Sequence, residues 1–229
     1  IVGEPKVDAG AISGDATAAD NLENAFDDTA GSVPWLGILD QGSLGACCGY
    51  AGTGALGTEP YYSRGGREAI LSEPVGPYDF AVQLYSDATR VDPWEGSYLP
   101  DDTGSSGLAI CKVLKKRGTI SGYRWATTPR GLVRLLQDGP VLLGMPWYEA
   151  FFDPGPGGFV DVGAWRRSPL AGGHEVEVAG VDVDAHDLAR SVLTIVNSWG
   201  TSYGEGGFFR LRLGTYDQLK GCDVKQYVV

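Results

Sequence analysis

The sequence predicts an α+β fold in which helices come first and a β-sheet follows. Apolar residues recur with helical spacing in the first half of the chain, and after Pro140 the pattern changes to the apolar runs and alternation of strands. Helices that precede strands, rather than alternating with them, are expected to pack as two lobes with a substrate cleft between them. The 229 residues, 43% of them hydrophobic, are enough to bury a substantial core.

Three helices are expected outside the motifs considered below. Residues 77–89 carry one apolar face, and residues 105–117 have a cap at Ser105 or Ser106 and a stop at Gly118. A short helix at 129–138 follows Thr128 as its cap. The apolar faces of the first two helices comprise Phe80, Ala81, Leu84, Tyr85 and Ala88 in one, and Leu108, Cys111 and Leu114 in the other.

Four strands are expected after Pro140, at 141–145, 174–184, 193–199 and 208–213. In the second strand Val176 and Val178 alternate with glutamates, and Glu177 is expected to face solvent. Gly180 shifts the phase of the alternation, which predicts a bulge. The aromatic pair Tyr61–Tyr62 and the cluster Trp147, Tyr148, Phe151 and Phe152 are interpreted as core.

The chain is acidic, with a net charge of -11 and a pI near 4.6. Such a surface disfavours nucleic acids and anionic membranes as partners. The acidity gathers at the start, so residues 1–32 are expected to be a solvated arm and residues 33–229 the folded domain, with a helical lobe at about 41–125 and a β lobe at about 126–215. No signal peptide or membrane-spanning segment is expected in this sequence, and the compartment is left open.

The segment DQGSLGACCGYA at 40–51 carries the strongest chemical signal. Small residues run into Cys47, which is expected to open a helix, where unpaired amides and the helix dipole favour a thiolate. Of the two histidines, His174 opens an expected strand after flexible glycines, whereas His186 lies in a loop and is expected to be solvated. Asn197, at the end of the next strand, is a candidate for orienting the imidazole of His174.

The segments DQGSLGAC, GGHEVEVAG and NSWGTSYGEGGFFRL together resemble the three signature blocks of the papain-like cysteine peptidases, in the same order. The resemblance covers roughly residues 33 to 213. It implies an α+β fold of two lobes and a cysteine peptidase that forms a thioester. It also implies that Cys47 is the nucleophile, His174 its base and Asn197 the group that holds the ring.

Further roles are implied by the resemblance alone. Gln41 matches the glutamine that stabilises the oxyanion together with the Cys47 N–H, and Trp199 matches the tryptophan that shields the histidine–asparagine contact. Substrate is expected along Ser105, Ser106 and Gly107 and against Gly173 and Glu175. Glu175 follows the histidine that the resemblance implies is catalytic, and two alternatives are open for it. If its carboxylate reaches the substrate pocket, a preference for Lys or Arg two places before the cut bond is expected. If it alternates with Val176 on a strand, its side chain is expected to face solvent.

The chain departs from that pattern at two positions. Leu44 stands where a structural cysteine is usual, and Cys48 stands where an aromatic residue usually follows the nucleophile. The segment DQGSLG is more similar to the bacterial or viral branch of the family than to other members. Cys111 is expected to be buried as a small hydrophobic residue, and either one Cys111–Cys222 bridge or free thiols are consistent with the four cysteines.

Three functions are consistent with the sequence: a peptidase acting on polypeptides, an amidase or transpeptidase acting on cell-wall peptides, and a catalytically silent binding module. No metal-ligand spacing and no nucleotide-binding loop is found, so no metal or other cofactor is expected. The partner expected is a polypeptide substrate, bound by a monomer.

Overall fold

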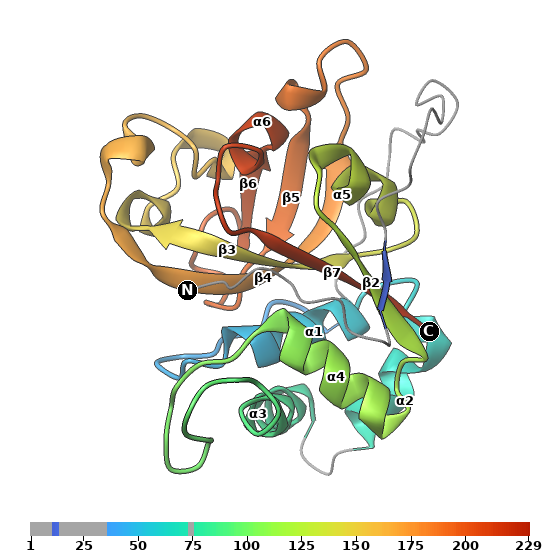
Figure 1. The fold of residues 1–229 in the computed structure, drawn as a ribbon. Helices are drawn as coiled ribbons and strands as arrows, with labels where there is room; N and C mark the ends of the chain where they lie inside the picture. The colour runs from blue at the N-terminus through green and yellow to red at the C-terminus, as the bar shows by residue number, and fades with distance from the viewer. Residues whose placement is uncertain (1–10, 14–35, 73–75) are drawn as a thin grey trace.

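The computed structural model describes residues 11–13, 36–72 and 76–229, and Figure 1 shows their arrangement. The acidic segment at 1–32 therefore lies outside the described residues except for strand β1 (Ala11–Ser13). This strand pairs in parallel with β2 (Gly122–Ala126). Among the described helices, none has the length and hydropathy of a membrane span.

One mixed sheet of seven described strands has the order β1-β2-β7-β3-β4-β5-β6. The strands that follow β2 are β3 (Val141–Tyr148), β4 (Leu170–Asp182), β5 (Val192–Val196), β6 (Phe208–Arg212) and β7 (Asp223–Val228). From β2 to β6 all neighbours in the sheet are antiparallel. The four strands expected from the sequence are β3 to β6, and the predicted bulge is confirmed as a register shift between Val178 and Gly180.

Strands β2 and β7 were not expected, because polar residues occupy buried positions in this part of the sheet. Gln226 is 1% exposed, and its amide donates to the carbonyl oxygens of Leu135 (2.5 Å) and Gly139 (2.8 Å). Its oxygen accepts from Arg124 Nε on β2 at 2.8 Å. Hydrogen bonds satisfied only in the folded chain thus allow a strand that lacks a clear apolar alternation.

The described α-helices are α1 (Cys47–Leu56), α2 (Arg67–Leu71), α3 (Pro77–Ala88), α4 (Gly107–Arg117), α5 (Pro129–Leu136) and α6 (Leu213–Tyr216). The expected caps are confirmed: Ser106 Oγ accepts from the Ala109 N–H, Thr128 Oγ1 accepts from the Gly131 N–H, and Gly118 ends α4 in the left-handed conformation. The whole predicted face of α3 is buried.

Two hydrophobic cores divide the α+β fold into two lobes. One core surrounds α1, α3 and α4, and the other lies between the sheet and α5 and α6. In Figure 1, α1, α3 and α4 lie together on one side of β3, β4 and β7, while β5, β6 and α6 lie on the other. Helix α1 also packs against β4, so it forms the main contact between the lobes.

This contact corrects the prediction for Glu177. The side of β4 opposite Val176 faces the helical lobe rather than solvent, and Glu177 is 1% exposed against Gly54 of α1. The strand pattern correctly separated the two faces of β4 but could not show that both faces are covered. The core prediction for the aromatic residues holds for Tyr61, Trp147 and Phe151, whereas Phe152 is 52% exposed.

Candidate active site

Cys47 is the first residue of α1, as predicted. Ala46 at the N-cap makes no side-chain hydrogen bond, so the first amides of the helix lack a side-chain cap, and those of Cys47 and Cys48 act to lower the pKa of the Cys47 thiol. Cys47 is half-buried, while Cys48 is fully buried in the helical core. Of the two adjacent cysteines, therefore, only Cys47 has accessible surface.

The segment before Cys47 is tied to the segment after Asn197. The Gln41 N–H donates to the Ser198 carbonyl at 2.8 Å, and the Gly200 N–H donates to the Leu39 carbonyl at 3.1 Å. Asp40 and Trp199 form an isolated antiparallel bridge between these bonds. The two signature segments, far apart in sequence, thus lie side by side.

His174 lies within β4, which begins four residues before it at Leu170 rather than at the histidine itself. Its Nε2 is 2.8 Å from Oδ1 of Asn197, which directly follows β5. The Ser198 N–H donates to the same Oδ1 at 2.8 Å. Because Oδ1 is the acceptor in both bonds, Nε2 carries the proton and Nδ1 keeps a lone pair that can accept one.

Cys47 adjoins the residue that follows this histidine. The backbone amide of Glu175 acts on the Cys47 thiol in the direction that lowers its pKa. The start of α1, which carries Cys47, and the part of β4 that carries His174 therefore meet at the contact between the lobes.

Aromatic rings enclose the imidazole of His174. Trp199 stacks on it, with ring centroids 4.7 Å apart and an angle of 25°, and Trp147 meets it edge-on at 4.7 Å. Phe152 in turn stacks on Trp199 at 5.4 Å. Trp199 therefore covers one face of the His174 imidazole.

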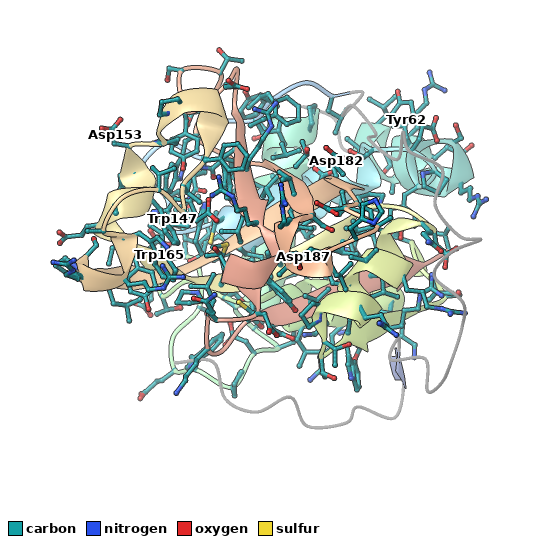
Figure 2. All side chains as sticks on the ribbon, turned by 90° about the horizontal axis from the view of Figure 1, so that it is seen from above. Tyr62, Trp147, Asp153, Trp165, Asp182 and Asp187 are labelled. Atoms are coloured by element: carbon teal, nitrogen blue, oxygen red, sulfur yellow. The ribbon has the colours of Figure 1, made fainter. Side chains whose placement is uncertain are left out.

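Trp147 and Phe152 were assigned only to the core, and their proximity to His174 was missed. Met145 is opposite His174 in the β3–β4 register, so Trp147, two residues further along β3, shares its face. That signal requires the register and is absent from the sequence alone. Figure 2 shows Trp147 and Trp165 on the same side of the molecule, opposite Tyr62.

Gln41 is held by two hydrogen bonds at its amide. Its Oε1 accepts from Ser198 Oγ at 2.6 Å, and its Nε2 donates to the Leu44 carbonyl at 2.7 Å. The amide nitrogen carries a second N–H, which this bond leaves for another acceptor. Ser198, which the sequence reasoning did not single out, therefore fixes both Gln41 and, through its own N–H, Asn197.

Burial dominates the proton affinity of Cys47 and His174. It raises the pKa of Cys47 to about 11, against the opposing effect of the Glu175 amide, because the sulfur is surrounded by protein although part of the residue is accessible. It lowers the pKa of His174 to about 4, against the hydrogen bond to Asn197. The sequence predicts that the helix N-terminus favours a thiolate, and that a proton partner is also needed. Desolvation outweighs the nearby amides, so each group taken by itself favours its neutral form.

The residues expected along the substrate are already engaged within the protein. Ser105 Oγ donates to Asp92 at 2.6 Å, and Ser106 caps α4. The Gly107 N–H donates to Glu175 Oε2 at 3.0 Å. Gly173, opposite Pro146 on β3, has open space beside its Cα. Substrate contacts at Ser105 and Ser106 would therefore involve the main chain.

Glu175 is buried at 7% exposure, which excludes the solvent-facing interpretation. Its carboxyl group crosses from β4 to the start of α4, and Oε1 has no hydrogen-bond partner among the described residues. Burial, reinforced by Asp223, raises the pKa of Glu175 to about 8, with Lys225 acting in the opposite direction. The buried carboxyl is therefore mostly protonated at neutral pH.

The remaining candidates lie apart from this site. Cys111 and Cys222 both carry free thiols, so no bridge joins them, and Cys111 is buried as expected. His186 lies in the exposed connection between β4 and β5. Within residues 36–72 and 76–229, no group of three or more His, Cys, Asp or Glu side chains is arranged to hold a metal ion.

Comparison with known proteins gives consistent results. The family model described as papain family cysteine protease matches residues 111–229. Cathepsin B-like cysteine proteinase 3 of Caenorhabditis elegans is 27% identical over 183 residues, covering 77% of this chain and 47% of the relative. Cysteine proteinase 3 of Entamoeba histolytica is 26% identical, covering 83% of this chain and 65% of that protein.

A solved structure shows the same fold. Xylellain, a cysteine protease from Xylella fastidiosa, superposes with a TM-score of 0.64 at 18% identity, covering 96% of this chain and 95% of that chain. The chain spans only about half to two thirds of the length of the two curated relatives. With the family match extending over more than half of its residues, the chain belongs to the papain family of cysteine proteases.

Proposed function

We propose that this chain is a cysteine peptidase that hydrolyses peptide bonds through Cys47, His174 and Asn197. The observation that carries the proposal is the pair of hydrogen bonds to Asn197 Oδ1, from His174 Nε2 and from the Ser198 N–H, both 2.8 Å. They orient the imidazole so that Nδ1 can act as the base, and the amide of Glu175, the next residue, acts to lower the pKa of the Cys47 thiol.

The reaction proceeds in two steps. His174 Nδ1 accepts the thiol proton as the Cys47 sulfur attacks the carbonyl carbon of the scissile bond. The proton then passes to the leaving amine, the C–N bond breaks, and a thioester is left on Cys47. Water, deprotonated by His174, hydrolyses the thioester, which releases the acid product and restores the thiol.

Proton transfer within the pair explains how a thiolate forms at a site where each charge alone is disfavoured. Burial raises the pKa of Cys47 and lowers that of His174, so neither group ionises independently. When the proton moves from one to the other, the two opposite charges form together and attract each other strongly in the same desolvated surroundings. The thiolate and the imidazolium therefore stabilise each other.

The oxyanion is assigned to the Cys47 N–H and to the second N–H of Gln41. The first is one of the unpaired amides at the start of α1, and the second belongs to an amide whose orientation is set by Ser198 and Leu44. Two fixed donors at the developing negative charge are worth more in the transition state than in the ground state.

Peptide hydrolysis is tested with wild-type protein and the Cys47→Ala variant, each incubated with casein and with purified peptidoglycan. We expect release of casein peptides by the wild type only. Cleavage of peptidoglycan without casein would identify a cell-wall amidase or transpeptidase instead. If neither substrate is cut and a thiol-directed peptide inhibitor does not label Cys47, the chain is a silent binding module.

The same inhibitor tests which adjacent thiol reacts. Mass spectrometry of the labelled protein should place the adduct on Cys47, and Cys48→Ser should keep most of the casein activity because Cys48 is buried in the helical core. An active Cys47→Ala variant with an inactive Cys48→Ser variant would shift the assignment by one residue.

We further propose that Glu175 sets a preference for Lys or Arg two places before the cut bond. Its Oε1 is buried without a partner among the described residues, and a basic side chain that reached it would form a charge-assisted hydrogen bond. Such a cation would also favour the ionised carboxylate, whose pKa burial holds at about 8. The gain is expected to be about tenfold in kcat/KM, since such a bond contributes roughly 1.5–3 kcal/mol.

A peptide library separates this role from a purely structural one. The basic preference should disappear in Glu175→Ala and weaken in Glu175→Gln, which keeps the bond from Gly107 but cannot ionise. A preference that is the same in wild type and both variants would remove Glu175 from the account of specificity.

The proposed partner is thus a polypeptide bound by a monomer, with no cofactor. We also propose that the chain is related to the bacterial or viral branch of the family. This proposal rests on the segment DQGSLG and on Leu44. The two curated relatives described above are eukaryotic.

A further inference from the structure

A hydrogen-bonded bridge joins the segment before the nucleophile to the loop that leads into α4. The Gly45 N–H, two residues before Cys47, donates to Asp102 Oδ2 at 2.9 Å. Asp102 lies in the loop that ends at Ser105 and Ser106, the residues proposed to run beside substrate. The Asp102 carboxylate therefore links the segment before Cys47 directly to the loop that leads into α4.

Tyr85 extends this bridge to the rest of the loop. Its hydroxyl donates to Asp102 Oδ1 at 2.6 Å and accepts the Gly104 N–H at 3.1 Å. Tyr85 is fully buried on α3, so its ring is a fixed anchor. Burial, followed by the bond to Asp102, raises the pKa of Tyr85, so the hydroxyl keeps its proton and remains the donor.

The residue at position 45, a glycine, leaves room for the Asp102 carboxylate. A Cβ atom at Gly45 would lie 2.9 Å from Asp102 Oδ1 and 3.4 Å from its carboxyl carbon, so only glycine allows the carboxylate to approach the backbone this closely. Leu44 next to it excludes a covalent cross-link at that position, and all four cysteines are free. The connection between the two segments is thus made by polar contacts.

We propose that Asp102, anchored by Tyr85, is a positioning residue that holds the Cys47 segment and the Gly104–Ser106 segment in register, so that a bound peptide presents its carbonyl to the sulfur. This inference rests on the proposed peptidase function. Asp102 does not touch the reacting atoms; it acts through Gly45 on one side and through Tyr85 and Gly104 on the other. Its loss leaves the fold intact, because Asp102 is an exposed residue and Tyr85 keeps its bond to Gly104.

The first test compares Asp102→Ala with Asp101→Ala, which removes the same charge one residue away. Asp102→Ala should lower kcat/KM for an extended peptide substrate about tenfold, since small misplacements of reacting groups have large effects on rate. Most of the loss should appear in kcat, and Asp102→Asn, which can still accept from the Gly45 N–H, should recover most of it. Equal activity of the two alanine variants, or no recovery with asparagine, would overturn the proposal.

A double-mutant cycle tests whether Asp102 and Tyr85 act as one unit. Tyr85→Phe should also lower kcat, and the Asp102→Ala/Tyr85→Phe double variant should be little worse than the poorer single variant. Losses that multiply would show two independent contributions and contradict a single bridge.

Hydrogen exchange of the whole chain tests the bridge without relying on activity. The Gly45 amide should exchange faster in Asp102→Ala than in wild type and the Gly104 amide faster in Tyr85→Phe, whereas both should be unchanged in Asp101→Ala. If the wild type cuts no peptide but these amides respond, the proposed function fails while the bridge stands. Unchanged exchange in Asp102→Ala would refute the bridge even in an active peptidase.

Discussion

At the scale of single residues, burial favours the neutral form of Cys47 and of His174 when each is considered by itself. The helix N-terminus and three backbone amides act on the Cys47 sulfur in the direction of a thiolate, yet burial outweighs them. His174 is likewise buried, and the bond to Asn197 only partly offsets the desolvation of its charged form. Reactivity at neutral pH must therefore come from the pair, and removal of one partner should reveal the intrinsic behaviour of the other.

His174→Ala provides that test. Without a base, the Cys47 thiol has to ionise alone against a pKa that burial raises to about 11. Alkylation by iodoacetamide should fall by orders of magnitude at pH 7 and then climb about tenfold per pH unit to above pH 9, because only the thiolate reacts.

His186→Ala is the matched control, since His186 is exposed in the loop between β4 and β5. It should leave both the rate and its pH profile unchanged. A flat alkylation profile in His174→Ala would show that the Cys47 thiolate does not depend on the histidine.

Gln41→Ala should lower kcat about 10²–10³-fold with little change in KM, as expected for the loss of one oxyanion donor. Ser198→Ala keeps the donor but removes the 2.6 Å bond that orients it, so it should show a smaller loss of the same kind. Steady-state kinetics on a peptide substrate measure both. A loss confined to KM would place Gln41 in ground-state binding rather than at the oxyanion.

At the scale of elements, the contact between α1 and β4 decides both the architecture and the position of the chemistry. Cys47 opens α1, and β4 carries His174, Glu175 and Glu177 in succession. The two glutamates face the helical lobe, and neither oxygen of Glu177 has a hydrogen-bond partner among the described residues, the Thr58 hydroxyl donating instead to the Gly54 carbonyl at 3.0 Å. Small residues in α1 are what allow this approach.

Gly54→Ala should destabilise the protein, although a change from glycine to alanine inside a helix ordinarily stabilises it by about 0.5–1 kcal/mol. The new Cβ atom would lie 2.6 Å from Glu177 Oε2 in a packed contact. We expect a loss of roughly 1–3 kcal/mol in the free energy of unfolding, measured by urea denaturation.

The sign of this effect should depend on Glu177. In a Glu177→Ala background the space next to Gly54 is vacated, and the same Gly54→Ala change should become neutral or stabilising. A loss of equal size in both backgrounds would locate the strain elsewhere than at the α1–β4 contact.

At the scale of the whole molecule, two hydrophobic cores meet across an interface that contains ionisable groups. Glu175, Glu177 and Lys225 are all buried there, and Asp223 pairs with Lys225. Burial raises the pKa of Glu177 to about 7 and, with Asp223, that of Glu175 to about 8, both from an ordinary value of 4.5. The stability of the joined lobes is therefore coupled to pH.

The free energy of unfolding should fall between pH 6.5 and pH 8.5. As pH rises above 4.5, the unfolded chain releases the protons of these carboxyls while the folded chain keeps them, so stability decreases until the folded pKa values of about 7 and 8 are passed. His174, whose folded pKa is lowered to about 4, acts in the opposite direction only below its unfolded value of 6.5. The expected loss in this window is on the order of 2–3 kcal/mol.

Urea denaturation at the two pH values measures this loss, and a Glu175→Gln/Glu177→Gln double variant provides the comparison. With both carboxyls replaced by neutral amides of similar shape, the free energy of unfolding should change little across the window. A wild type whose stability is constant or rises from pH 6.5 to pH 8.5 would contradict the protonated state of these groups.

The sequence by itself determined the residues that carry the proposed chemistry and most of the elements that hold them. Cys47, His174, Asn197 and Gln41 are recognisable because each stands in a short local segment, and helices such as α3 and α4 follow from apolar spacing and caps within a dozen residues. Only the tertiary structure decided the rest: the strands β2 and β7, the burial of Glu177, the aromatic rings around His174 and the desolvation of Cys47 and His174. Each of these depends on which surfaces are covered by distant parts of the chain. Desolvation and hydrogen bonding arise only when those parts meet, and so they leave little trace in the local pattern of residues.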